Sequence, residues 1–161
     1  HIARHVLKNN FDVKCISKSL KNSNWPGRLQ LISEGLLTKK IIKFKNIYLD
    51  GFHNIDGMKV LINSLELNQK KILICSFLNN KKYIYMLKQL LKHFNKIIVV
   101  KMNEENSIIK DDIPKDLPVK FVSSLNNSFK LINQYSNSKT SIYFGGSLYF
   151  IGNVLSINNL K

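Results

Sequence analysis

Asp50 and His53 are the residues whose types and spacing most directly indicate chemistry. They lie three positions apart in the stretch IYLDGFHNIDG, in which an apolar run ends in an acid before glycine, phenylalanine, histidine and asparagine. A strand-end carboxylate can accept hydrogen bonds from a hydroxyl, a ring nitrogen or another side chain. A histidine one turn later can contact a phosphate or a neighbouring carboxylate. The pattern therefore marks a candidate binding site at the tip of a strand.

Asn54, which follows His53, has a structural role of its own. Asparagine is a favoured N-cap, and Asn54 stands directly before the apolar stripe of a predicted helix. The free backbone amides at the start of that helix would face the same side as His53. A purely structural interpretation stays open as well: Asp50 and Asn54 would satisfy backbone groups of a turn, and His53 would only pack.

Arg28 is the second candidate. It follows the Pro26-Gly27 turn in the stretch NWPGRLQLI, and Arg4 is the only other arginine of the chain. A guanidinium held next to a hinge could clamp a phosphate through paired hydrogen bonds. The alternative is a salt bridge that steadies the linker.

The third candidate is the stretch YFGGSLYFIGNVL, where an apolar run meets two glycines, a serine and a helical pattern. Gly145 and Gly146 would let the backbone approach a ligand closely. Ser147 could cap the helix and present its hydroxyl, with the nearby amides, to a carboxylate. Plain capping of the helix is the alternative.

These candidates must be positioned by the elements that flank them. Short apolar segments predict strands at 29–33, 47–50, 72–77, 97–101, 119–122 and 141–144. Several of these segments are apolar at successive positions, as strands buried on both faces of a parallel sheet are. The stretch 102–118 is polar, contains two prolines and predicts a long loop with one short turn at most.

Helical stripes alternate with these strands. Apolar residues recur at helical spacing in four groups: Met58, Leu61, Ile62 and Leu65; Ile84, Leu87, Leu91 and Phe94; Leu125, Phe129 and Ile132; and Leu148, Ile151 and Leu155. Repeated strand–helix units predict an α/β fold, a Rossmann-like open and mostly parallel sheet of about six strands with helices on both faces. Such sheets bind ligands at the carboxyl ends of their strands, where Asp50 and His53 lie.

Two domain segments are expected. Residues 1–22 carry helical stripes in two pieces, and the Pro26-Gly27 hinge then breaks the pattern, so the α/β domain is assigned to 23–161. The sequence contains neither G-x-G-x-x-G after a strand nor G-x-x-x-x-G-K-[ST]. The chain therefore lacks both standard phosphate-binding loops.

Composition narrows the class further. The chain has 161 residues, 44% of them hydrophobic, and no apolar run near the roughly 20 residues that span a bilayer. Cys15 and Cys75 are far apart and show no metal-binding spacing, so we expect a reducing cytoplasm, no membrane and no metal site. The net charge of +15 comes mainly from scattered lysines. Compositional drift is favoured over nucleic-acid binding, because base recognition favours arginine.

Taken together, the three motifs resemble one family. WPGRLQ, LDGFHNIDG and GGSLYFIG, in this order and spacing, are similar to the C-terminal part of folylpolyglutamate synthase and the bifunctional dihydrofolate synthase, of the Mur ligase superfamily. The resemblance covers about 24–155 and implies a Mur ligase C-terminal domain. The segment 1–22 resembles the end of the family's central ATPase domain.

The resemblance implies an ATP-dependent ligase. ATP phosphorylates a carboxylate of dihydropteroate or a folate, and the amino group of L-glutamate attacks the resulting acyl phosphate to form an amide. The family's central domain supplies the P-loop and holds Mg²⁺, while the C-terminal domain closes over the nucleotide. The partners implied are therefore ATP, L-glutamate, the folate substrate and the P-loop domain of the same enzyme. The isolated chain is expected to be inactive.

The resemblance also implies roles for single residues. In the family, the residues that match Arg28, Asp50 and His53 face ATP, with Gly51 and Asn54 as supporting residues.

The late Gly-Ser segment of the family is linked with glutamate binding. It matches Gly146 and Ser147.

The sequence departs from the family pattern at three places. Ile55 replaces the usual proline, Phe52 replaces a small residue, and NNKK at 79–82 replaces an acidic segment. The last change could weaken nucleotide or partner-domain contacts. The alternatives are another Mur-type amide ligase domain and a non-catalytic basic module that binds nucleic acid.

Overall fold

The computed structural model describes residues 25–159 of the chain. The helical segment predicted at 1–22, including Arg4 and Cys15, lies outside the described residues. The described residues lie within the predicted α/β domain, 23–161.

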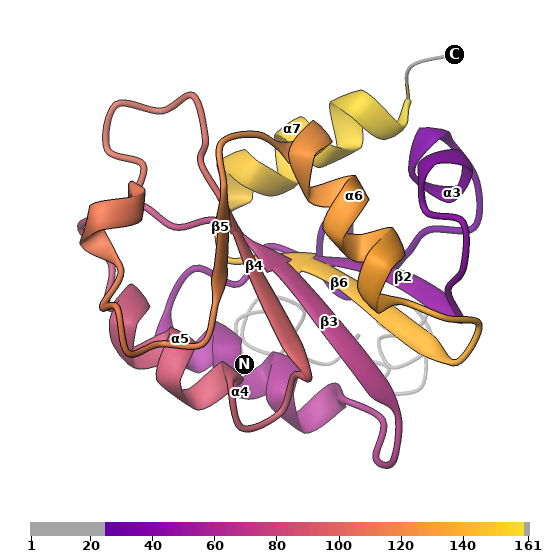
Figure 1. Ribbon diagram of the computed structural model, residues 1–161, viewed down its shortest axis with the longest axis horizontal. Coiled ribbons are helices and arrows are strands. Elements are labelled where there is room, and N and C mark those ends of the chain that lie inside the picture. The colour runs from indigo at the N-terminus through magenta and orange to yellow at the C-terminus, as the bar shows by residue number, and fades with distance from the viewer. Residues whose placement is uncertain (1–24, 160–161) are drawn as a thin grey trace, which may run out of the picture.

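The described domain is built on one sheet. Its strands span Gln30–Leu31 (β1), Asn46–Asp50 (β2), Lys70–Cys75 (β3), Lys96–Val100 (β4), Lys120–Val122 (β5) and Thr140–Gly145 (β6). The six strands lie in the order β1-β2-β6-β3-β4-β5, so that β6 lies between β2 and β3 (Figure 1). Only β1 pairs antiparallel with its neighbour. The predicted open, mostly parallel sheet is confirmed.

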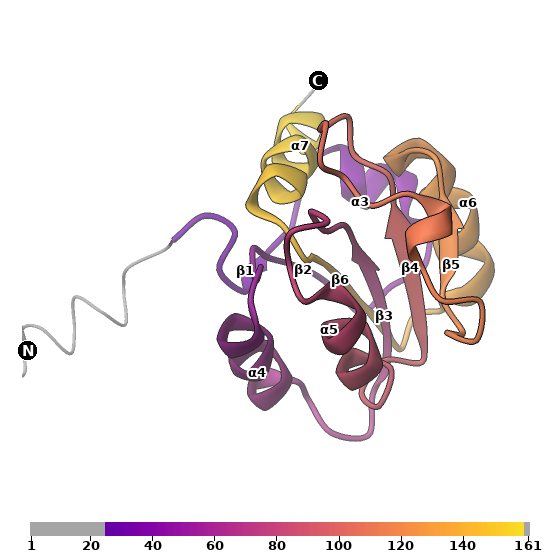
Figure 2. The same cartoon turned by 90° about the vertical axis from the view of Figure 1, so that its left-hand side faces the viewer.

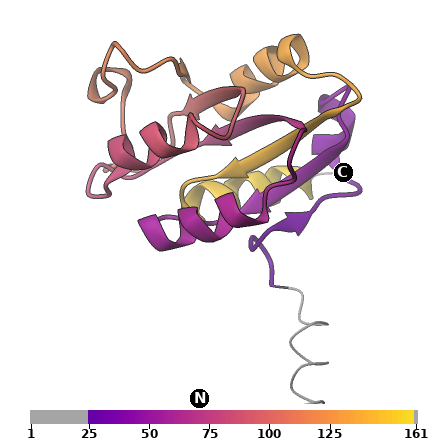
Figure 3. The same cartoon turned by 90° about the horizontal axis from the view of Figure 1, so that it is seen from below.

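Helices cover both faces of this sheet. They span Leu36–Lys40 (α3), Ile55–Ser64 (α4), Tyr83–Leu90 (α5), Leu125–Tyr135 (α6) and Leu148–Asn158 (α7), and Lys110–Asp112 form the short 3-10 turn η2. α4 and α5 lie on one face, whereas α3, α6 and α7 lie on the other (Figure 2). In Figure 3, α7 runs alongside β6, the strand that it follows.

Alternating side chains of the central strands build a core on each face. Along β3, Ile72 and Ile74 belong to the core between the sheet and helices α3, α6 and α7. Leu73 and Cys75 belong to the core between the sheet and helices α4 and α5. All four residues are fully buried. Because successive side chains of a strand point to opposite faces, a strand covered on both sides must be apolar at every position. This burial accounts for the uninterrupted apolar run in the sequence.

Two elements differ from the prediction. The helix α3 was not predicted, because its five residues are too few to show a periodic stripe. A distant contact fixes its start: the Leu37 amide donates to the Asn158 side chain of α7 over 3.0 Å. The first strand is shorter than the predicted 29–33, since Leu29 has a left-handed φ of 43°.

Other predictions hold wholly or in part. The stretch 102–118 is a loop whose one helical element is η2, but it has more turns than predicted: the Ser107 amide donates to the Glu104 carbonyl and the Leu117 amide to the Pro114 carbonyl, each at 3.0 Å. Cys75 is a free, buried thiol of the core. Among the described helices, none combines the length and the apolar character needed to cross a membrane.

Candidate functional site

The carboxyl ends of β2, β6 and β3 bring the predicted motifs together. Asp50 of β2 and Cys75 of β3 both align with Gly145 of β6. The chain leaves β2 toward α4 on one face, but it leaves the adjacent β6 toward α7 on the other face (Figure 2). Neighbouring parallel strands whose connections diverge in this way leave a crevice, which is where open α/β sheets bind ligands.

Asp50 holds the hinge and the strand tip together. Its Oδ2 accepts a hydrogen bond from the Leu29 amide at 3.0 Å, and its Oδ1 accepts one from the Phe52 amide at 2.9 Å. The Gly51 amide also donates to the Gly27 carbonyl at 2.6 Å. These two long-range hydrogen bonds, together with one from the Arg28 side chain, therefore fix the hinge to the end of β2.

The environment of Asp50 disfavours its charged form. Burial raises the pKa of this carboxyl above its ordinary value, and it outweighs the two backbone amides and the nearby Arg28, which lower the pKa. A raised pKa means that the hydrogen bonds do not fully replace the water that the carboxylate loses.

Arg28 and His53 converge on one backbone carbonyl. The Arg28 Nη1 donates to the Gly51 carbonyl at 3.1 Å, and the His53 Nδ1 lies 3.1 Å from the same oxygen. Because a carbonyl oxygen only accepts hydrogen bonds, Nδ1 must carry the hydrogen in this contact. Nε2, on the opposite edge of the ring, is then not used by the Gly51 carbonyl. Within residues 25–159, neither side chain forms any other hydrogen bond, and Arg28 takes part in no salt bridge.

A pocket of about 300 Å³ lies at this edge of the sheet and contains predicted residues from two motifs. We call it the strand-tip pocket. It is lined by His53, Leu78, Asn80, Lys81, Gly146, Ser147, Leu148 and Tyr149. The sequence thus predicted His53, Gly146 and Ser147 as site residues, and the fold places them around one cavity.

The Gly-Gly-Ser segment approaches the neighbouring strand closely. Gly146 has a φ of 96°, and a Cβ there would collide with the Ser76 carbonyl oxygen. Ser147 is the N-cap residue of α7, but its side chain makes no cap hydrogen bond. Its hydroxyl is therefore not occupied by the role that the capping alternative gave it.

Asn54 does act as a cap. Its side chain accepts a hydrogen bond from the Gly57 amide at 2.8 Å, and α4 begins at the next residue, Ile55. The predicted N-cap is confirmed, and the helix forms without the proline that the family has at this position.

Phe52, the bulky departure from the family pattern, is a core residue. It is fully buried, and its ring packs edge-on against Phe77 with 6.1 Å between ring centroids. A Cβ at Gly145 would collide with the Phe52 ring. The glycine of β6 therefore provides the space for the larger side chain of the β2 turn.

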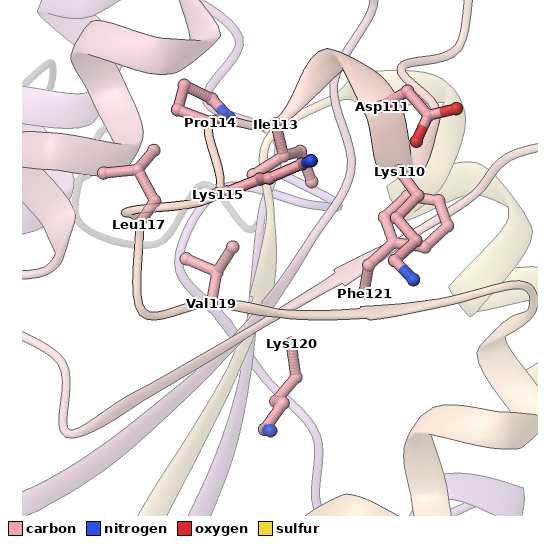
Figure 4. A pocket seen from close by; sticks show the side chains of 9 residues that line it. All are labelled: Lys110, Asp111, Ile113, Pro114, Lys115, Leu117, Val119, Lys120 and Phe121. Carbon is pink, nitrogen blue, oxygen red and sulfur yellow. The ribbon is translucent and has the colours of Figure 1, made fainter.

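A larger pocket lies elsewhere and contains none of the predicted residues. It measures about 790 Å³ and is formed by the loop around η2 and by β5. Figure 4 shows Val119 pointing into the ring made by this loop, whereas Lys120 points to the opposite side. Lysines, Asp111 and apolar residues line it, and none of the predicted site residues does, so the strand-tip pocket remains the candidate site.

Sequence reasoning missed part of the strand-tip pocket. In the sequence, Asn80 and Lys81 stand out only as a departure from the family pattern, Leu148 only as part of a helical stripe, and Tyr149 not at all, yet all four line the pocket. The sequence shows that 79–82 follows a strand, but the pairing of β3 with β6, which brings this segment to the pocket, is seen only in the structure. Among residues 25–159, no cluster of three or more His, Cys, Asp or Glu side chains could hold a metal ion.

Fold and site together define a Rossmann-like α/β domain with a ligand crevice at the carboxyl edge of its sheet. No protein-family model matches the sequence. The chain is 26% identical over 147 residues to the dihydrofolate synthase/folylpolyglutamate synthase of Bacillus subtilis, covering 88% of this chain and 32% of that protein. It is 24% identical over 170 residues to a probable dihydrofolate synthetase of Schizosaccharomyces pombe, covering 94% and 39%.

The fold has the same relatives. The bifunctional folylpolyglutamate synthase/dihydrofolate synthase of Yersinia pestis, solved with AMPPNP and a manganese ion, superposes with a TM-score of 0.79 at 17% identity, over 97% of this chain and 37% of that chain. These matches confirm the resemblance to dihydrofolate and folylpolyglutamate synthases, and the solved structure shows that the fold is shared. The chain spans about a third of the length of the curated relatives it matches.

Proposed function

We propose that this chain is the C-terminal domain of an ATP-dependent ligase that adds L-glutamate to dihydropteroate or folates. The observation that carries this proposal is the strand-tip pocket, in which residues of the second and third motifs line one cavity beside the hinge that bears Arg28. The similarity to dihydrofolate and folylpolyglutamate synthases supports the reaction class.

Arg28 and His53 suit the recognition of ATP phosphates. The exposed Arg28 uses one N–H group on the Gly51 carbonyl and keeps the others for an anion. The His53 ring is fixed by Nδ1 and keeps Nε2 for the ligand. Asp50, with Gly51 and Asn54, contributes by holding this wall in place, and a direct contact between Asp50 and ATP stays a prediction. ATP, when bound, supplies the phosphoryl group that activates the carboxylate of the folate substrate.

Gly146 and Ser147 suit the recognition of the incoming L-glutamate. The Ser147 hydroxyl is not used to cap α7, and a carboxylate is favoured near the start of this 11-residue helix. The conformation of Gly146 brings the backbone close to β3 and leaves the pocket open above it.

The remaining parts of the reaction belong to a partner domain. The sequence contains no P-loop, so the triphosphate and Mg²⁺ would be held mainly by the P-loop domain of the same enzyme. Closure of the two domains would exclude water that otherwise hydrolyses the acyl phosphate. The 161-residue chain alone is therefore expected to lack ligase activity.

The test is the incorporation of radiolabelled L-glutamate into dihydropteroate and into folates. The protein made from the complete coding sequence that includes these 161 residues is expected to incorporate glutamate only when ATP is present, and the isolated chain is expected to incorporate none. Activity with a different acceptor, such as a peptidoglycan precursor, would assign the domain to another Mur-type ligase. Incorporation by the isolated chain would contradict the proposed division between domains.

A further inference from the structure

Lys81 gives the strand-tip pocket a positive charge that no carboxylate of its lining neutralises. His53, Lys81 and Tyr149 are the titratable residues that line the pocket, and no carboxylate does. The two salt bridges within residues 25–159 join Lys45 with Glu66 and Lys59 with Asp56. The Lys81 ammonium forms neither a salt bridge nor a hydrogen bond with the described residues. A ligand with a negative charge would complement this pocket.

The backbone that carries Lys81 is fixed in place. Leu78 forms an isolated bridge with Ser107, and the Asn79 amide donates to the Asn106 carbonyl at 2.8 Å. The Lys81 amide then closes a turn by donating to the Leu78 carbonyl at 3.1 Å. The turn is thus anchored to the loop after β4, so that Lys81 stays at the wall of the pocket.

Ser147 supplies a second polar group to the lining of the same pocket. The residue is only 2% exposed and lines the pocket, yet its hydroxyl forms no hydrogen bond with the described residues. Among residues 25–159, the fully buried side-chain oxygen without a partner is Ser136 Oγ, not the Ser147 hydroxyl, so Ser147 is implicated by its place in the lining of the pocket. The hydroxyl lies at the start of α7, where the helix dipole favours an anion.

We infer that Lys81 is a specificity-determining residue that pairs with a carboxylate of the incoming acidic amino acid, with the Ser147 hydroxyl as the hydrogen-bond donor on the other side. This inference rests on the proposed function and adds Lys81 to it. Of the segment 79–82, Asn80 and Lys81 then form a wall of the amino-acid site, and the departure of this segment from an acidic pattern has a chemical role.

The size and lining of the pocket favour an amino acid over a nucleotide phosphate. A volume of about 300 Å³ is at the lower end of small-molecule sites. Leu78, Leu148 and Tyr149 provide apolar walls that suit the methylene groups of a glutamate side chain. Lysine acts as a point charge, which suits a single carboxylate.

The test compares Lys81→Ala with Lys82→Ala in the protein made from the complete coding sequence. Lys82 is the matched control because it is exposed and does not line the strand-tip pocket. We expect Lys81→Ala to raise the KM for L-glutamate about 10- to 100-fold, because a charge-assisted hydrogen bond is lost. The KM for ATP should stay unchanged, Lys81→Arg should restore most of the affinity, and Lys82→Ala should behave as wild type.

Two outcomes overturn the inference. An unchanged KM for L-glutamate in an active Lys81→Ala enzyme would show that Lys81 does not bind the amino acid, although the proposed function would stand. A rise in the KM for ATP alone would assign the charge to a phosphate. If the wild-type protein shows no ligase activity, the proposed function fails. Equilibrium dialysis with radiolabelled L-glutamate then still decides the inference, because Lys81-dependent binding supports it and its absence overturns it.

Discussion

Removal of the Asp50 carboxylate should detach the hinge from the sheet. In Asp50→Ala, the amides of Leu29 and Phe52 lose their acceptor. The Phe52 amide is part-buried, so its loss is expected to cost about 1–3 kcal/mol, whereas water can replace the acceptor of the exposed Leu29 amide at about 0.5–1.5 kcal/mol. The removed carboxylate was itself partly desolvated, which offsets some of this loss. The expected decrease in unfolding free energy is about 2–3 kcal/mol.

Asp50→Asn should have an intermediate effect. Its carboxamide oxygen can still accept from the Phe52 amide, but its NH₂ group cannot accept from the Leu29 amide. The expected loss is about 1 kcal/mol. Asp56→Ala is the control, because the Asp56 side chain is 90% exposed and its salt bridge with Lys59 is expected to contribute little.

Urea unfolding followed by circular dichroism measures these differences, and amide hydrogen exchange locates them. Asp50→Ala should accelerate the exchange of the Gly51 amide, which bonds to Gly27 across the hinge at 2.6 Å. If Asp50→Ala unfolds at the same urea concentration as Asp56→Ala, and the Gly51 amide stays protected, then Asp50 does not hold the hinge.

Three further predictions concern single groups. Gly146→Ala should lower the unfolding free energy by at least about 1 kcal/mol, because Gly146 has a φ of 96° and a Cβ there would collide with Ser76. Gly152→Ala, on the open side of α7, should instead raise the unfolding free energy by about 0.5–1 kcal/mol. Urea unfolding compares the two variants, and equal effects would refute the strain assigned to Gly146. Cys75 should resist iodoacetamide in the folded protein and react after denaturation, because burial raises the pKa of its thiol. Peptide mass spectrometry measures the labelling of Cys75. Rapid labelling of Cys75 in the native protein would contradict its burial. Burial raises the pKa of Asp50 above 3.8, so the stability that this group contributes to the wild type is greatest in acid and falls as the pH rises through the raised pKa. The unfolding free energy of the wild type should therefore exceed that of Asp50→Asn by more near pH 4 than at pH 7. The opposite trend would contradict the raised pKa.

The sheet could be predicted from the sequence because its strands are covered on both faces. Burial on both sides forces residues such as Ile72–Cys75 to be apolar at every position, and this run is visible without a structure. The helix α3 could not be predicted, because its start depends on Asn158, which is 121 positions away from Leu37. A long-range hydrogen bond leaves no local pattern.

In the candidate site, too, local sequence features could be predicted and long-range contacts could not. His53, Gly146 and Ser147 were predicted from strand ends and turn residues, and these local features do place them at one pocket. The role of Lys81 could not be read in this way, because it depends on which strand lies next to β6 in the sheet. The engagement of both Asp50 oxygens by backbone amides likewise depends on how the hinge folds back onto β2.

The assignment of the strand-tip edge as the nucleotide-facing site is tested most directly by ATP-dependent incorporation of L-glutamate. The rate of His53→Ala is measured beside that of His93→Ala in the protein made from the complete coding sequence. His93 is exposed and lies away from the strand-tip pocket, so its variant should match the wild type. We expect His53→Ala to lower the rate by about 100-fold, because one group that binds the reacting charge is removed. Wild-type rates in both variants would contradict the assignment of this edge of the sheet as the nucleotide-facing site.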